Sequence, residues 1–91
     1  MDPSRDRILR QLGARVRELR AVRNFSQVQL GRKTDLHPTY LSGIERGTRN
    51  PTVVILARLA DGLRVTLSVL LIEVIGDREP PPSDRLKGVG P

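Results

Sequence analysis

The apolar residues of the chain recur at intervals of three and four, the spacing of a helix that buries one face. In the first segment they fall at Ile8, Leu12, Val16, Leu19 and Val22. This spacing predicts a first helix over residues 4–23. Asn24 follows directly, and asparagine tolerates the left-handed backbone that ends many helices. We therefore expect the first helix to end at that point.

The second predicted helix has a complete start signal. Ser26 and Gln29 form an S-x-x-Q capping box, and Phe25 and Leu30 are placed as a hydrophobic staple around it. These signals predict a helix from residue 27 to about residue 33. The connection to the first helix is very short, so the two helices must pack against each other.

A third helix is predicted over residues 38–46. Proline suits the first position of a helix, where Pro38 stands, and Gly47 is placed to end the helix. Leu41 and Ile44 are expected to point inward, and Tyr40 is open between an inward position and a surface contact. The predicted structure is therefore two short helices separated by a turn.

Two further helices follow. Thr52 is a plausible cap for a fourth helix that ends at Gly62, and Thr66 for a fifth that reaches about residue 75. The fourth helix is expected to bury Val53, Leu56, Ala57, Leu59 and Ala60. Residues 76–91 contain seven Gly or Pro among sixteen, and we expect them to form a flexible tail. The sequence thus predicts an all-α, compact five-helix domain over residues 4–75.

The turn between the second and third helices contains Asp35, which tolerates a left-handed backbone, and the apolar Leu36. An apolar residue makes sense in that turn if it fills the space between the two helices. Short helices joined in this way, here over residues 27–46, form a helix-turn-helix. The second helix of such a pair fits the DNA major groove, which is about 12 Å wide.

The distribution of charge changes the picture further. The chain carries a net charge of +6, with eleven Lys or Arg against five Asp or Glu in residues 1–49 and five of each in residues 50–91. A basic first half favours contact with a polyanion. The alternative is a set of solvated helix faces in a chain that uses 14 Arg and 2 Lys.

Several chemistries are not expected. The chain has no cysteine, which excludes a disulfide framework and a thiol nucleophile. His37 is the single histidine, so we expect no metal site, no cofactor and no enzyme activity. The apolar stretch over residues 65–75 is too short to span a bilayer, and no leader pattern begins the chain. We expect a cytoplasmic protein with no membrane partner.

Four segments together resemble the phage repressor/Cro-type family of helix-turn-helix DNA-binding domains. They are RELR (17–20), FSQVQL (25–30), YLSGIERGTRNP (40–51) and LARLADGL (56–63). The resemblance extends over residues 12–71. The string TYLSGIER (39–46) is also similar to the third helix of the controller proteins of restriction–modification systems.

The resemblance implies specific roles for residues. It implies that Arg20 and Glu45 form an ion pair tying the first helix to the third, with a surface pair of little consequence as the alternative. It implies DNA contacts at Gln27, His37, Thr39, Tyr40, Ser42, Gly43, Arg46, Arg49 and Asn50. Hydroxyl groups at the third helix would contact base edges, and the residues beyond it would contact phosphates. His37 is alternatively a helix cap.

The fifth predicted helix has more apolar residues than the core needs. Leu67, Leu70 and Leu71 suffice to meet the core, and four are left over: Val69, Ile72, Val74 and Ile75. Unused apolar surface of this kind favours a homodimer, with packing under residues 4–9 as the alternative. A two-fold dimer would place two reading helices about 34 Å apart on a near-palindromic site.

The sequence therefore predicts a dimeric, sequence-specific transcriptional regulator of double-stranded DNA. The alternative is an antitoxin-type interaction module that neutralises a toxin and regulates its own operon. A toxin or RNA polymerase would be a further protein partner under these hypotheses.

Overall fold

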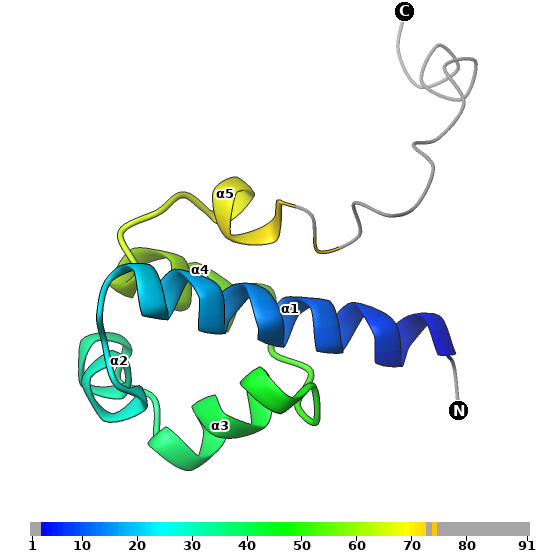
Figure 1. Ribbon diagram of the computed structural model, residues 1–91, viewed down its shortest axis with the longest axis horizontal. Coiled ribbons are helices and arrows are strands. Elements are labelled where there is room, and N and C mark those ends of the chain that lie inside the picture. The colour runs from blue at the N-terminus through cyan, green and yellow to red at the C-terminus, as the bar shows by residue number, and fades with distance from the viewer. Residues whose placement is uncertain (1–2, 73, 75–91) are drawn as a thin grey trace, which may run out of the picture.

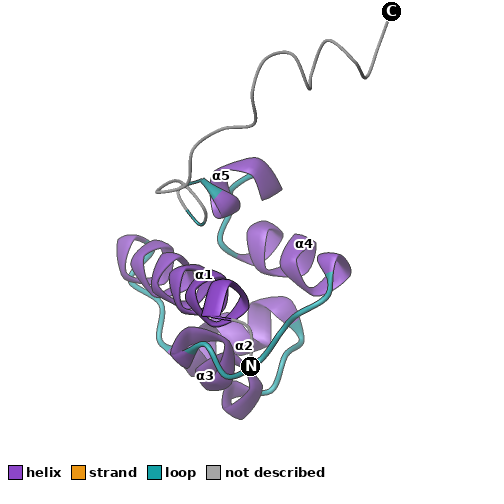
Figure 2. Cartoon of the chain, turned by 90° about the vertical axis from the view of Figure 1, so that its right-hand side faces the viewer, coloured by secondary structure: helices purple, strands orange, loops and turns teal. Residues whose placement is uncertain are grey.

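The computed structural model describes residues 3–72 and 74, and all regular secondary structure in this part of the chain is helical, without a strand. The helices are α1 (Pro3–Val22), α2 (Gln27–Thr34), α3 (Pro38–Arg46), α4 (Val53–Gly62) and α5 (Leu67–Leu71). The long α1 runs across the molecule, with α3 on one side of it and α5 on the opposite side (Figures 1 and 2). The five predicted helices are confirmed, whereas the predicted tail lies outside the described residues.

The helix starts follow the predicted caps. The Ser26 hydroxyl accepts a hydrogen bond from the Gln29 backbone N–H at 3.0 Å, and the Gln29 side chain accepts one from the Ser26 N–H at 2.7 Å. Thr52 and Thr66 each accept a hydrogen bond from the third residue beyond them, at 3.2 and 3.1 Å. Each cap satisfies a backbone donor that the helix leaves free.

The connections are short because residues with positive φ reverse the chain. Asn24 (φ 61°), Asp35 (φ 56°) and Gly47 (φ 80°) adopt the left-handed conformation, as the sequence indicated for each. Arg64 adopts it as well, with φ 60°, in the turn between α4 and α5. Three of the four turns therefore place a residue with a side chain in a conformation that glycine adopts more readily.

The core is aliphatic and lies where the helices meet. Leu30, Leu41, Ile44, Leu59, Leu63 and Leu70 are fully buried, and Leu36 packs against them as the predicted plug. The prediction for the start of α4 is wrong. Val53 is 69% exposed and Ala57 is also exposed, because α4 turns its Leu59 and Ala60 face toward the core.

The end of the described chain also differs from expectation. α5 ends at Leu71, and Ile72 has an extended backbone, so the prediction of a helix reaching residue 75 is wrong. Val74 donates a backbone hydrogen bond to the Leu71 carbonyl at 3.1 Å and is only 5% exposed. This turn returns Val74 to the core, so its assignment to a free dimer surface is also wrong. Ile75 lies outside the described residues.

Candidate nucleic-acid interface

The carboxyl end of α3 is fixed by α1 at very close range. A Cβ atom on Gly13 would lie 2.4 Å from the Glu45 carbonyl oxygen and 2.5 Å from that of Ile44. Gly47 is similarly close to Arg10, whose backbone nitrogen would lie 3.1 Å from an added Cβ. α1 contacts α3 at this end, and the amino-terminal end of α3 slopes away from α1 (Figure 1).

The turn between α2 and α3 is held from two sides. Gly31 allows the chain to return closely, since an added Cβ would lie 2.6 Å from the Leu36 carbonyl oxygen. From α4, the Arg58 guanidinium donates hydrogen bonds to the carbonyl oxygens of Thr34 and Asp35, both at 2.8 Å. These bonds satisfy two carbonyl oxygens at the turn and attach the turn to α4.

Glu45 is a buried carboxylate on which three helices converge. Its side chain is 3% exposed and accepts two hydrogen bonds from Arg20, at 2.7 and 2.9 Å. Arg17 lies 3.8 Å away, and the Gln27 amide of α2 donates a hydrogen bond at 3.2 Å. The hydrogen bond to Glu45 raises the pKa of Arg20 above its ordinary value, so the guanidinium stays charged. The predicted ion pair is present, and its burial favours the tying role.

Short polar side chains occupy the start of α3. His37 caps the helix, because its Nδ1 accepts a hydrogen bond from the Thr39 backbone N–H at 3.0 Å. Thr39 is exposed and Ser42 is half-buried. The Arg46 guanidinium donates to the Ser42 hydroxyl, one turn away. Residues 39, 42 and 46 therefore share one face of α3, as their spacing requires.

Gly43 is covered by the loop that follows α3. It is buried, and an added Cβ would lie 2.7 Å from Cγ of Arg49 and 3.3 Å from the Thr48 hydroxyl oxygen. The loop after α3 folds back over Gly43, so the side chain of Arg49 covers it, and the DNA contact implied for Gly43 stays a prediction. The Arg49 guanidinium lies 5.9 Å from the centre of the Tyr40 ring, and Tyr40 itself is half-buried against the core.

The remaining predicted DNA contacts lie at the edges of this surface. Gln27 is half-buried at the start of α2, with its side chain engaged by Glu45, and Asn50 is exposed beyond α3. Sequence reasoning missed the structural roles of Gly13 and Arg58. For Arg58 no local signal exists, because an arginine on a helix ordinarily indicates a solvated face.

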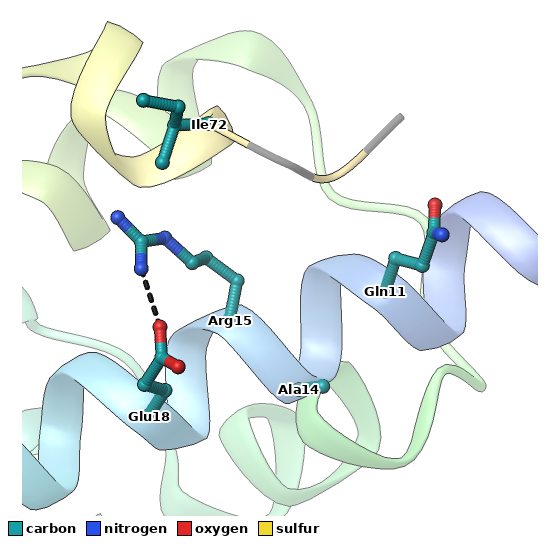
Figure 3. Close-up of a pocket in the computed structure, with 5 residues that line it drawn as sticks. All are labelled: Gln11, Ala14, Arg15, Glu18 and Ile72. Atoms are coloured by element: carbon teal, nitrogen blue, oxygen red, sulfur yellow. Dashed lines mark hydrogen bonds and ion pairs between the residues drawn. The ribbon is translucent and has the colours of Figure 1, made fainter. Parts of the chain in front are cut away.

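A second surface lies on the opposite side of α1, next to α5. Val69 is 39% and Ile72 is 54% exposed. Arg15 reaches from α1 to the end of α5, where its guanidinium donates to the Val69 carbonyl at 2.8 Å. Ile72 lines a shallow groove of about 200 Å³ together with α1 residues, shown in Figure 3. The four α1 residues of the groove are Gln11, Ala14, Arg15 and Glu18.

The described residues contain neither a membrane-spanning helix nor a cluster of metal-binding side chains. In residues 3–72 and 74, no helix is long and apolar enough to cross a membrane. The same residues contain no group of three or more His, Cys, Asp or Glu side chains placed to hold a metal ion.

Comparison with known proteins places the chain in a family. The helix-turn-helix domain family matches residues 11–70. Control protein C.BamHI of Bacillus amyloliquefaciens is 42% identical over 60 residues, covering 65% of this chain and 74% of that protein. The transcriptional regulator RamB of Mycobacterium tuberculosis is 42% identical over 50 residues, covering 55% of this chain but only 10% of RamB.

Solved structures give the same result. The controller protein C.AhdI of Aeromonas hydrophila is 37% identical with a TM-score of 0.67, covering 68% of this chain and 94% of that one. The controller protein C.Esp1396I, solved as a tetramer with its natural 35-base-pair operator, is 32% identical with a TM-score of 0.69, covering 75% of this chain and 90% of that one. The chain therefore belongs to the helix-turn-helix domain family, in the phage repressor and controller-protein group of DNA-binding transcription regulators.

Proposed function

We propose that this chain is a transcriptional regulator that binds a near-palindromic operator as a homodimer and reads the major groove of each half-site with α3. The observation that carries the proposal is the presentation of α3. Its carboxyl end is fixed through Gly13 and the buried Glu45, whereas Thr39 at its other end is exposed. A helix whose carboxyl end is packed against α1 and whose amino end is exposed suits insertion into a groove about 12 Å wide.

The residues at and beyond the carboxyl end of α3, and those at the start of α2, suit a phosphate backbone. Arg46, Arg49 and Asn50 are exposed at the carboxyl end of α3 and in the loop that follows. The amino end of α2 presents the backbone of Gln27, and anions bind readily to the free N–H groups of a helix start. Cations and amides at the two ends of the helix pair would position α3, while hydroxyl groups between them would contact base edges.

Self-association is the second part of the proposal. Val69 and Ile72 are exposed apolar residues beside the groove against α1, and this surface lies across α1 from α3 (Figure 1). A partner bound there would leave the start of α3 free. In the dimer we propose, the two copies of α3 lie about 34 Å apart, one turn of DNA.

Selection of bound fragments from a random duplex library tests the DNA-binding part. We expect one enriched near-palindromic sequence, with an affinity that falls steeply as salt rises because bound cations release counterions. Thr39→Ala and Ser42→Ala should relax base preference, whereas Ser68→Ala, on exposed α5 surface, should leave it unchanged. Selection of no sequence, or equal effects from all three variants, would contradict this reading of α3.

Sedimentation of a matched pair of variants tests the dimer. Ile72→Asp introduces a charge on the proposed interface, and Val54→Asp introduces the same charge on α4 at a residue that is 68% exposed. We expect Ile72→Asp alone to shift the protein toward monomer and to weaken operator binding. A monomeric wild-type protein, or equal dissociation in both variants, would exclude this surface as the interface.

A further inference from the structure

The start of α3 lacks a side chain that can make two hydrogen bonds to one base. Its first two turns, residues 38–44, contain the hydroxyl groups of Thr39, Tyr40 and Ser42 but no Arg, Asn or Gln. Bidentate contacts between such side chains and purines supply much of the discrimination in direct readout. The Ser42 hydroxyl already accepts a hydrogen bond from Arg46. A helix with these residues alone would read little sequence.

The loop after α3 brings a guanidinium back to that face. The Thr48 backbone N–H and hydroxyl both donate to the Gly43 carbonyl, at 2.9 and 3.1 Å. With the loop fixed in this way, the Arg49 side chain passes over Gly43, where its Cγ and Nε would lie 2.7 and 3.4 Å from an added Cβ. Any residue larger than glycine at position 43 would displace Arg49.

The position of Gly43 on the helix shows which strip Arg49 covers. At about 100° per residue, Gly43 lies about 40° from Thr39 on one side and about 60° from Tyr40 on the other. Arg49 therefore lies along α3 between an exposed hydroxyl and the Tyr40 ring, with its guanidinium 5.9 Å from the centre of that ring. This contact directs the planar group toward the amino end of the helix.

We propose that Arg49 is a specificity-determining residue, which donates its guanidinium fork to the major-groove edge of a guanine, and that Gly43 is its positioning residue. The inference rests on the proposed function and replaces the expectation of a phosphate contact for Arg49. A phosphate contact depends mainly on positive charge, which a flexible lysine also supplies. A guanine contact requires a planar fork at a fixed position, and the Gly43 surface and the Tyr40 ring provide that position.

The conservative variant Arg49→Lys tests the inference, because it keeps the charge and removes the fork. Three duplexes are compared. The first is the selected operator, the second is the same operator with an A·T pair at one G·C position of each half-site, and the third has an unrelated sequence. We expect Arg49→Lys to lose about tenfold in discrimination at one G·C pair of each half-site. Its affinity for the unrelated duplex should change less than about twofold, since the charge remains. Arg49 is exposed, so the variant leaves the helix packing unchanged.

Gly43→Ala and Arg64→Lys complete the experiment. Gly43→Ala keeps Arg49 but displaces it, and should lose discrimination at the same base pair. Arg64→Lys makes the same exchange at an exposed arginine between α4 and α5. It should change neither the discrimination at the G·C pair nor the affinity for the unrelated duplex. If the wild-type protein enriches an operator but Arg49→Lys discriminates between base pairs as well as the wild type does, this inference is overturned and the proposed function is not. A wild-type protein that selects no sequence overturns the proposed function as well.

Discussion

Replacing Arg20 with methionine measures how strongly the buried carboxylate of Glu45 depends on its partner. The Arg20 and Glu45 side chains are 19% and 3% exposed, and their two hydrogen bonds are 2.7 and 2.9 Å long. Breaking a buried ion pair from one side costs about 3–5 kcal/mol. Because Arg17 and Gln27 remain near Glu45, at 3.8 and 3.2 Å, we expect the lower end of that range, about 3 kcal/mol. This loss corresponds to a Tm lower by about 12–24 °C for a domain of this size.

Urea unfolding followed by circular dichroism, at one protein concentration, measures this loss. The midpoint should fall at an unchanged m value. The matched control is Arg17→Met, which removes a cation that is 57% exposed and 3.8 Å from Glu45, and should cost less than about 1 kcal/mol. The double variant Arg20→Met/Glu45→Leu should recover most of the stability, because an apolar pair of similar volume carries no unpaired charge.

Two results would refute this reasoning. A loss in Arg20→Met no greater than in Arg17→Met would mean that Glu45 does not depend on Arg20. A double variant less stable than Arg20→Met would mean that the ion pair itself stabilises the contact between α1 and α3.

Three further predictions use the same unfolding assay. Gly13→Ala should destabilise the protein by about 1–3 kcal/mol, since the added Cβ would lie 2.4 Å from a backbone carbonyl of α3. A gain in stability, which helix propensity alone predicts, would contradict this packing. Asp35→Gly should stabilise the protein by about 1 kcal/mol, because Asp35 has φ 56° and its side chain is exposed. A loss of stability would show that the ion pair between Asp35 and Arg58, at 3.8 Å, contributes to folding. Ser26→Ala should cost about 1 kcal/mol through the lost cap of α2, and an unchanged midpoint would argue against the capping box.

The helix boundaries were largely predictable because their signals are local. Ser26, Thr52 and Thr66 each act on a backbone N–H three residues away, and Asn24 and Asp35 reverse the chain through their own φ angles. Interactions of this kind are visible in a short window of sequence. The inward positions of Leu41 and Ile44 followed from helical spacing for the same reason.

Burial at the element ends was not predictable in this way. Val53 is apolar and begins α4, yet it is 69% exposed, because its burial depends on whether another helix reaches that turn. Val74 is buried because the chain turns after Leu71, and helical spacing carries no information about such a turn. The spacing of apolar residues shows which face of a helix is buried. It does not show how far along that face the neighbouring helices reach.

The candidate site divides in the same manner. The Arg20–Glu45 pair is present as the sequence resemblance implied, and Thr39 is exposed at the start of α3, where its contact with DNA stays a prediction. The covering of Gly43 by Arg49 was not foreseen, because a side chain six residues away returns over the helix only when the intervening loop is fixed by Thr48. The sequence identified the residues, and the loop conformation determined which of them lie together.

The bonds from Arg58 to the carbonyl oxygens of Thr34 and Asp35 bear on any attempt to transplant the α2–α3 pair. A peptide of residues 27–46, or the same segment grafted onto a foreign scaffold, would lack the hydrogen bonds from Arg58 of α4. The carbonyl oxygens of Thr34 and Asp35 would then have no guanidinium partner. Its interhelical angle would then be free to drift. A graft that preserves the angle has to include an equivalent guanidinium, so the smallest portable unit extends well past the two helices.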